Sequence, residues 1–146
     1  MSINQKVIAA CLGSVILSLI IVGVVSGTLI RHIIQIVPVI FALITVRRKS
    51  IWGVYAALPI FVLWLFIMTL IWLFLLGMAS VVRGHFTVVE IILTLLIGAS
   101  SILGIVAVIR DRTHVEFKIS VSVFVLFSAL QVVAMWISFK RPFVNI

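Results

Sequence analysis

The chain has 146 residues, of which 65% are hydrophobic and 10% are charged. An ordinary soluble domain has about 45–50% apolar and about 25% charged residues, and a small one with so few polar residues could not cover its own surface. The composition therefore excludes most soluble folds and predicts an all-α, polytopic transmembrane helix bundle surrounded by lipid. The net charge is +8, but the positive residues are scattered between apolar stretches, which indicates membrane topology and contacts with anionic lipid headgroups instead of nucleic-acid binding.

Five apolar segments are expected to cross the bilayer, because about 20 apolar residues span its hydrocarbon core. They are predicted at 7–25, 28–46, 51–77, 88–109 and 117–139, in a single integral membrane domain covering 1–146. The second segment is long enough only if it begins at Thr28, after a Ser26-Gly27 turn, and takes Arg31 and His32 into its first turns. The alternative is a protein with four spans and a re-entrant second segment.

Several residues mark where the helices begin, bend and end. The third segment is longer than one span, so Pro59 is expected to kink it and Gly77 to end it. Two helix starts fit the Thr-x-x-Glu capping box, in which the hydroxyl and the carboxylate bind backbone N–H groups of the first turn. These boxes pair Thr87 with Glu90 and Thr113 with Glu116.

The basic residues favour one orientation, since Lys and Arg are enriched on the cytoplasmic side of membrane proteins. With five spans, the side of the N-terminus carries the larger group: Lys6, Arg47, Arg48, Lys49, Arg110, Arg112 and Lys118. The opposite side carries Arg31, Arg83, Lys140 and Arg141. We therefore expect the N-terminus inside and the C-terminus outside. The sequence has no transit peptide, so a plasma membrane of the bacterial inner-membrane type is the expected location.

One group of polar residues is predicted to gather at the outer end of the bundle. Arg31, His32 and Gln35 are three or four residues apart on neighbouring faces of one helix, within reach of His85 and Glu90. Such a group could bind a quinone headgroup, hold a metal or haem through His32 and His85, or line a transport route. The structural interpretation is favoured: Arg31 reaches the headgroups, His32 and Gln35 bond the backbone or another helix, and Glu90 caps its helix. No histidine pair has a metal-ligand spacing, so no metal site is predicted and the cofactor is left unknown.

Gln131 is the deepest strongly polar residue, with Ser128 about one turn before it. We expect its amide to hydrogen-bond another helix or another subunit, because an unpaired amide is unfavourable in lipid. A substrate pathway lined by Gln131 and Ser128 is the alternative.

Small residues recur at four-residue spacing in two segments and predict closely packed helix faces. They are Ser14, Ser18, Gly23 and Gly27 in the first segment and Ser100 and Gly104 in the fourth. The sequence leaves open whether these faces pack within the chain or against another chain.

The sequence contains no phosphate-binding loop, nucleophile elbow, zinc motif or acid–base set, so no catalytic residue is predicted. The first interpretation is an accessory or assembly subunit, or a scaffold, of a membrane complex. Its expected partners are the lipid bilayer and other membrane subunits or copies of itself, and nucleic acid is not among them. The alternatives are a small oligomeric transporter or channel, and a redox-complex subunit that contacts quinone or haem.

Overall fold

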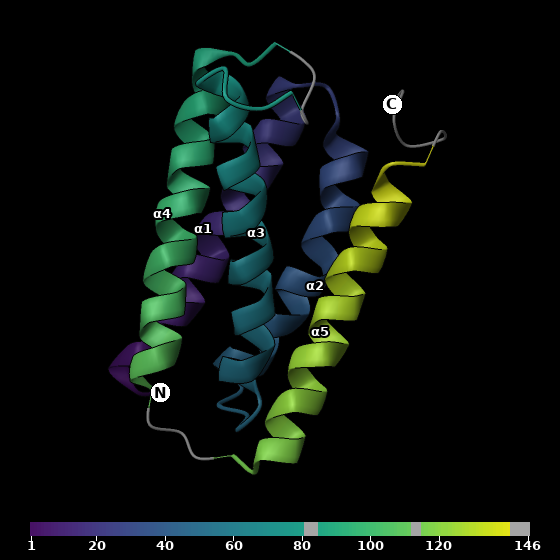
Figure 1. Ribbon diagram of the computed structural model, residues 1–146. Coiled ribbons are helices and arrows are strands. Elements are labelled where there is room, and N and C mark those ends of the chain that lie inside the picture. The colour runs from purple at the N-terminus through teal and green to yellow at the C-terminus, as the bar shows by residue number, and fades with distance from the viewer. Residues whose placement is uncertain (81–84, 112–114, 141–146) are drawn as a thin grey trace.

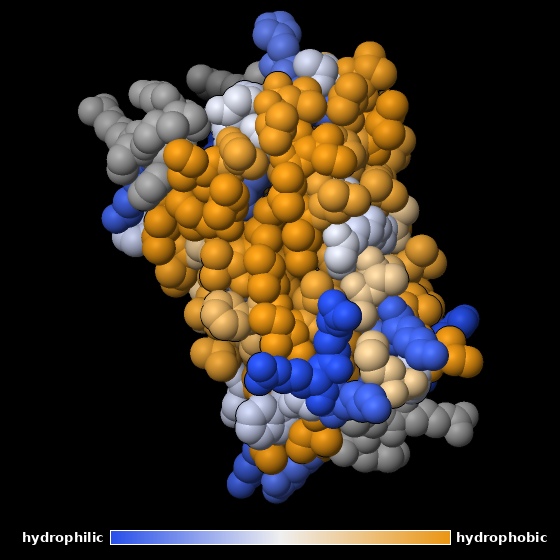
Figure 2. Space-filling view, turned by 180° about the vertical axis from the view of Figure 1, so that it is seen from behind, coloured by the Kyte–Doolittle hydropathy of each residue, from blue (hydrophilic) through white to orange (hydrophobic). Residues whose placement is uncertain are grey.

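The computed structural model describes residues 1–80, 85–111 and 115–140, which form a bundle of helices that run alternately in opposite directions (Figure 1). The helices are α1 (Ile3–Val25), α2 (Leu29–Arg47), α3 (Gly53–Leu75), α4 (Val88–Arg110) and α5 (Phe117–Ser138). All 5 are long and apolar enough to cross a membrane. The face seen in Figure 2 is mostly hydrophobic, with hydrophilic side chains gathered toward its ends. The predicted all-α, five-span bundle is confirmed.

The second helix settles the choice between five and four spans in favour of five. α2 is one continuous helix of 19 residues that begins at Leu29, after the Ser26-Gly27 turn. It holds Arg31 and His32 in its first turn, as predicted for a second segment that begins at Thr28. α1 begins at one end of the bundle and α5 ends at the other (Figure 1), as an odd number of antiparallel helices requires. Which end is cytoplasmic stays a prediction.

Two helix starts carry a complete capping box. At α4, Glu90 N–H donates to Thr87 Oγ1 over 3.3 Å and Thr87 N–H donates to Glu90 Oε2 over 2.7 Å, which confirms this predicted box. At α1, Gln5 N–H donates to Ser2 Oγ over 3.1 Å and Ser2 N–H donates to Gln5 Oε1 over 3.2 Å. The second box is absent from the prediction, and it explains why α1 begins at Ile3 and not at residue 7.

The predicted capping box at the start of the fifth helix is wrong. α5 begins at Phe117 and has Glu116 as its N-cap, with extended backbone and no capping hydrogen bond from its side chain. The box would need Glu116 to be the third helical residue, which requires the helix to start sooner. Thr113, the other half of that box, lies outside the described residues.

Glycines end two of the helices. Gly27 after α1 and Gly77 after α3 have φ values of +67° and +73°, in the left-handed region that a side chain disfavours. After α3, Met78 N–H donates to Leu73 O over 2.8 Å, closing a Schellman motif around Gly77. The predicted end of the third helix at Gly77 is therefore confirmed to within two residues.

The two ends of the bundle differ in packing. We call the end where α2 and α4 begin the Glu90 end, and the end where they finish the Asp111 end. The apolar side chains with no exposed surface concentrate in the middle and in the half nearer the Asp111 end: Ile8, Leu12, Val15, Val39, Ala42, Ala56, Ala57, Ile60 and Phe61. Hydrogen bonds fasten this end as well, since Asn4 Nδ2 donates to Arg110 O over 3.0 Å and Ser2 Oγ to Asp111 Oδ2 over 2.9 Å. This half is a close-packed core.

Candidate functional site

The half of the bundle nearer the Glu90 end is hollow. It contains a cavity of about 500 Å³, lined by residues from all the helices described above. The polar lining residues are Ser26, Thr28, Arg31, His32, Gln35, Glu90 and Thr94. The apolar and aromatic lining residues are Leu19, Val22, Trp64, Ile67, Met68, Ile71, Phe86, Ile97, Met135 and Phe139.

The cavity reaches from the end of the bundle to about its middle. Arg31 and Glu90 lie in the first turns of α2 and α4, whereas Trp64 and Ile97 lie near the middles of α3 and α4. The distance from Glu90 to Ile97 along the helix axis is about 10 Å at about 1.5 Å per residue. The polar residues therefore surround the outer part, and the inner part is mainly apolar.

Arg31 brings a positive charge to the cavity. Its guanidinium carbon lies 3.9 Å from the centroid of the Phe139 ring, so α5 holds the side chain by a cation–π contact. Its Nε atom is buried and donates to no acceptor in the part of the chain that the structure describes. A guanidinium carries five N–H donors and no acceptor, so Arg31 is suited to bind oxygen atoms of a ligand.

His32 and Gln35 continue along the same helix into the cavity. His32 Nδ1 lies 3.0 Å from the backbone oxygen of Thr28. Thr28 Oγ1 also lies 3.1 Å from Nδ1, so Thr28 engages this ring nitrogen in either tautomer, as acceptor through its backbone oxygen or as donor through its hydroxyl. Gln35 is buried, and its Nε2 donates to Ser138 Oγ on α5 over 2.9 Å.

Glu90 adds a negative charge to the lining, but its carboxylate is already occupied. Oε2 accepts from the backbone N–H of Thr87 over 2.7 Å and from Thr87 Oγ1 over 2.8 Å. His85, in contrast, is exposed and lies outside the set of lining residues. The structure thus brings Arg31, His32, Gln35 and Glu90 together around one cavity and does not add His85.

The histidine pair considered for metal or haem is accordingly not assembled on this cavity. Within residues 1–80, 85–111 and 115–140, no group of at least three His, Cys, Asp or Glu side chains could hold a metal ion.

Trp64 is a lining residue that the sequence did not single out for the site. It is 2% exposed, and its Nε1 is buried without a hydrogen-bond partner among the described residues. A buried indole N–H usually finds an acceptor. A tryptophan in the middle of an apolar helix is therefore the sequence signal that could have identified this lining residue.

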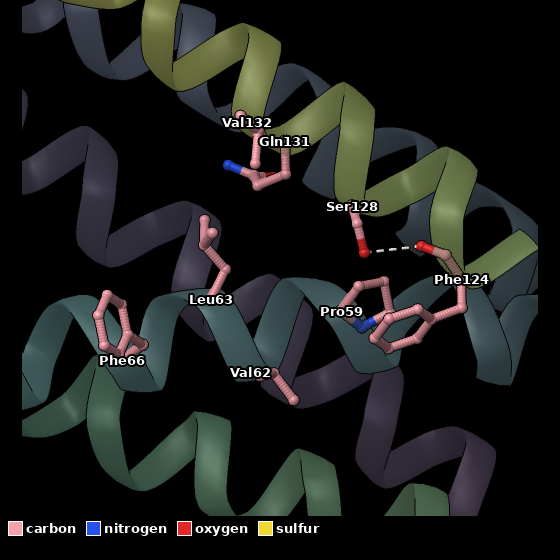
Figure 3. A pocket seen from close by; sticks show the side chains of 8 residues that line it. All are labelled: Pro59, Val62, Leu63, Phe66, Phe124, Ser128, Gln131 and Val132. Atoms are coloured by element: carbon pink, nitrogen blue, oxygen red, sulfur yellow. Dashed lines mark hydrogen bonds between the residues drawn. The ribbon is translucent and has the colours of Figure 1, made fainter.

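Gln131 and Ser128 lie outside this cavity, at a groove of about 250 Å³ between α3 and α5 (Figure 3). Gln131 has no exposed surface, and its Nε2 donates to the backbone oxygen of Gln35 over 3.2 Å. This hydrogen bond joins α5 to the backbone of α2.

Replacing Gln131 by leucine is expected to lower the free energy of unfolding by about 0.6–2 kcal/mol, because α5 loses its amide bond to α2. Ser128→Ala is the matched control, since Ser128 Oγ donates only within α5, to Phe124 O over 2.8 Å. Reversible unfolding of the purified protein in mixed detergent micelles, followed by circular dichroism, measures both variants. Equal stability of the two would contradict a role for Gln131 in holding α5 to α2.

The small residues expected at packing faces lie in contacts within the chain. Ser100 Oγ on α4 donates to Ser14 Oγ on α1 over 3.0 Å, and Ser18 is buried. A methyl group at Gly23 would lie 3.0 Å from Leu29 Cα, and one at Gly104 would overlap the ring of Phe61. Gly27 forms the turn after α1. These residues therefore give no independent reason to expect another chain.

Comparisons with protein-family models, with curated proteins and with solved structures found no match for this chain.

Proposed function

We propose that this multi-pass membrane protein binds a small amphipathic molecule in the cavity at its Glu90 end, as a ligand-binding protein or as the binding step of a carrier. The observation that carries the proposal is the unequal filling of the bundle. One half is close-packed, and the other contains a cavity of about 500 Å³ whose lining combines apolar side chains with charged and polar ones.

Polar side chains inside a membrane bundle are expensive and usually serve a function. A bundle with only a scaffolding task could fill this half with apolar side chains, as it does the other half. Sites for small molecules typically measure about 300–1,000 Å³ and combine a mainly apolar wall with a few polar groups. The cavity fits this description in both volume and lining.

The close-packed half also favours binding over free conduction. The cavity extends to about the level of Trp64 and Ile97, and beyond that level buried apolar side chains of the described residues pack against one another. A molecule that enters from the Glu90 end would stop near the middle of the bundle. Transport would then need a second conformation, in agreement with the carrier alternative and not with an open channel.

Filling the cavity is expected to abolish binding. Thr94 lines it and is 5% exposed, whereas Leu95, its neighbour on α4, is 53% exposed on the outer surface. Calorimetric titration of decanoate and decanol into phosphatidylcholine nanodiscs, corrected for empty nanodiscs, measures binding to each variant. Thr94→Phe should bind neither probe, and Leu95→Phe should bind as the unmodified protein does.

The proposal fails if neither probe binds to the unmodified protein, or if Thr94→Phe binds as well as Leu95→Phe. Circular dichroism and size-exclusion chromatography show whether Thr94→Phe is folded. If it is not, Ile97→Phe fills the inner end of the same cavity and replaces it in the comparison.

A further inference from the structure

We propose that the ligand is an organic acid with an apolar body, whose acid group binds Arg31 at the outer part of the cavity. This inference rests on the proposed function and specifies the chemical class of its ligand. Organic acids from lipids and free organic acids share this chemistry, which is a carboxylate on a hydrocarbon body.

The charge of Arg31 calls for an anionic partner. The guanidinium is partly buried beside the cavity, where it rests on the Phe139 ring, and its Nε donates to no acceptor among the described residues. A cation that is partly removed from water is stabilised by an anionic partner, and a carboxylate offers the oxygen pair that matches the planar guanidinium. An acid group of the ligand would supply both the charge and the acceptors.

Glu90 does not fill this role. Its carboxylate sits at the N-terminus of α4, where it accepts two hydrogen bonds from Thr87 and is stabilised by the helix dipole. These interactions compensate much of its negative charge, so they also weaken its repulsion of an anionic ligand. Among the charged residues of the lining, Arg31 therefore determines the sign of the ligand's charge.

The inner part of the cavity determines the chemistry of the rest of the ligand. Beyond Gln35, the wall consists mainly of apolar and aromatic side chains such as Trp64, Ile67 and Ile97. Hydrocarbon is stabilised there by burial, at roughly 25 cal/mol per Å² of apolar surface. The acid group thus lies toward the Glu90 end, and the hydrocarbon body points to the middle of the bundle.

The test compares decanoate with decanol, which differ in the acid group and share the apolar body. The unmodified protein is expected to bind decanoate at least about tenfold more tightly than decanol, since hydrogen bonds to a charged group are stronger than neutral ones. Arg31→Gln should remove this preference, and Arg31→Lys should keep part of it. Arg47→Gln, at the exposed far end of the same helix, is the control and should bind as the unmodified protein does.

If the unmodified protein binds the two probes with equal affinity and Thr94→Phe binds neither, the acid assignment is overturned and the proposed function stands. A decanoate preference that persists in folded Arg31→Gln would also overturn it. Absence of binding by either probe would overturn the proposed function, and the acid assignment with it.

Discussion

Gly104→Ala is expected to lower the free energy of unfolding by about 1–3 kcal/mol, the usual effect of forcing an extra carbon into a close-packed core. The added methyl group would lie 2.7 Å from Cδ2 of Phe61 and still closer to other atoms of that ring. Phe61 has no exposed surface and belongs to the buried apolar cluster, so its ring cannot turn out to solvent without leaving that cluster. Relief would require α3 and α4 to separate in the close-packed half of the bundle.

Gly98→Ala on the same helix is the matched control for this prediction. A methyl group at Gly98 would have Met68 Cβ as its nearest neighbour, at 3.9 Å, which is an ordinary contact. Alanine also favours the helix over glycine, so this variant should be as stable as the unmodified protein or more stable. Detergent-induced unfolding followed by circular dichroism measures both. If Gly104→Ala proved as stable as Gly98→Ala, the close approach of α3 and α4 at Phe61 would be refuted.

The helices could be predicted from the sequence because lipid imposes a simple rule on them. A span needs about 20 apolar residues, and charges and turn formers bound each run. Gly77 could be recognised as an end because glycine accepts the left-handed conformation. The start of α5 could not, because the Thr-x-x-Glu pattern at Glu116 matches a capping box whether or not the helix has begun there.

The contacts between helices were harder to predict. A stripe of small residues predicts close packing but does not name the partner, and only the structure shows that Ser14 meets Ser100 and that Gly104 meets Phe61. Likewise, only the structure shows that Gln131 on α5 donates to the backbone oxygen of Gln35 on α2.

The candidate site was predictable in part. The spacing of Arg31, His32 and Gln35 put these residues on adjoining faces of one helix, and the helix order put Glu90 at the same end of the bundle. The cavity between them could not be foreseen, because a hollow depends on the volumes of side chains from every helix. For the same reason, the sequence could not show that Trp64 lines this cavity.

Cysteine labelling tests most directly whether the bundle is open toward Glu90 and close-packed toward Asp111. The chain has 1 cysteine, Cys11, so Cys11→Ala provides a background without thiols. Thr94 lines the cavity, and Ser101 lies about two helical turns further along α4, where it is fully buried in the solid half. Each is replaced by cysteine, as is the outward-facing Leu95.

A membrane-impermeant maleimide is added to the protein in nanodiscs, where both ends of the bundle are accessible, and modification is followed by mass spectrometry. Thiols react through the thiolate, which needs water, so only a thiol in the open cavity should be modified readily. We predict rapid modification of Thr94→Cys and little or none of Ser101→Cys or Leu95→Cys. An unreactive Thr94→Cys, or equal reaction of Thr94→Cys and Ser101→Cys, would contradict this account of the molecule.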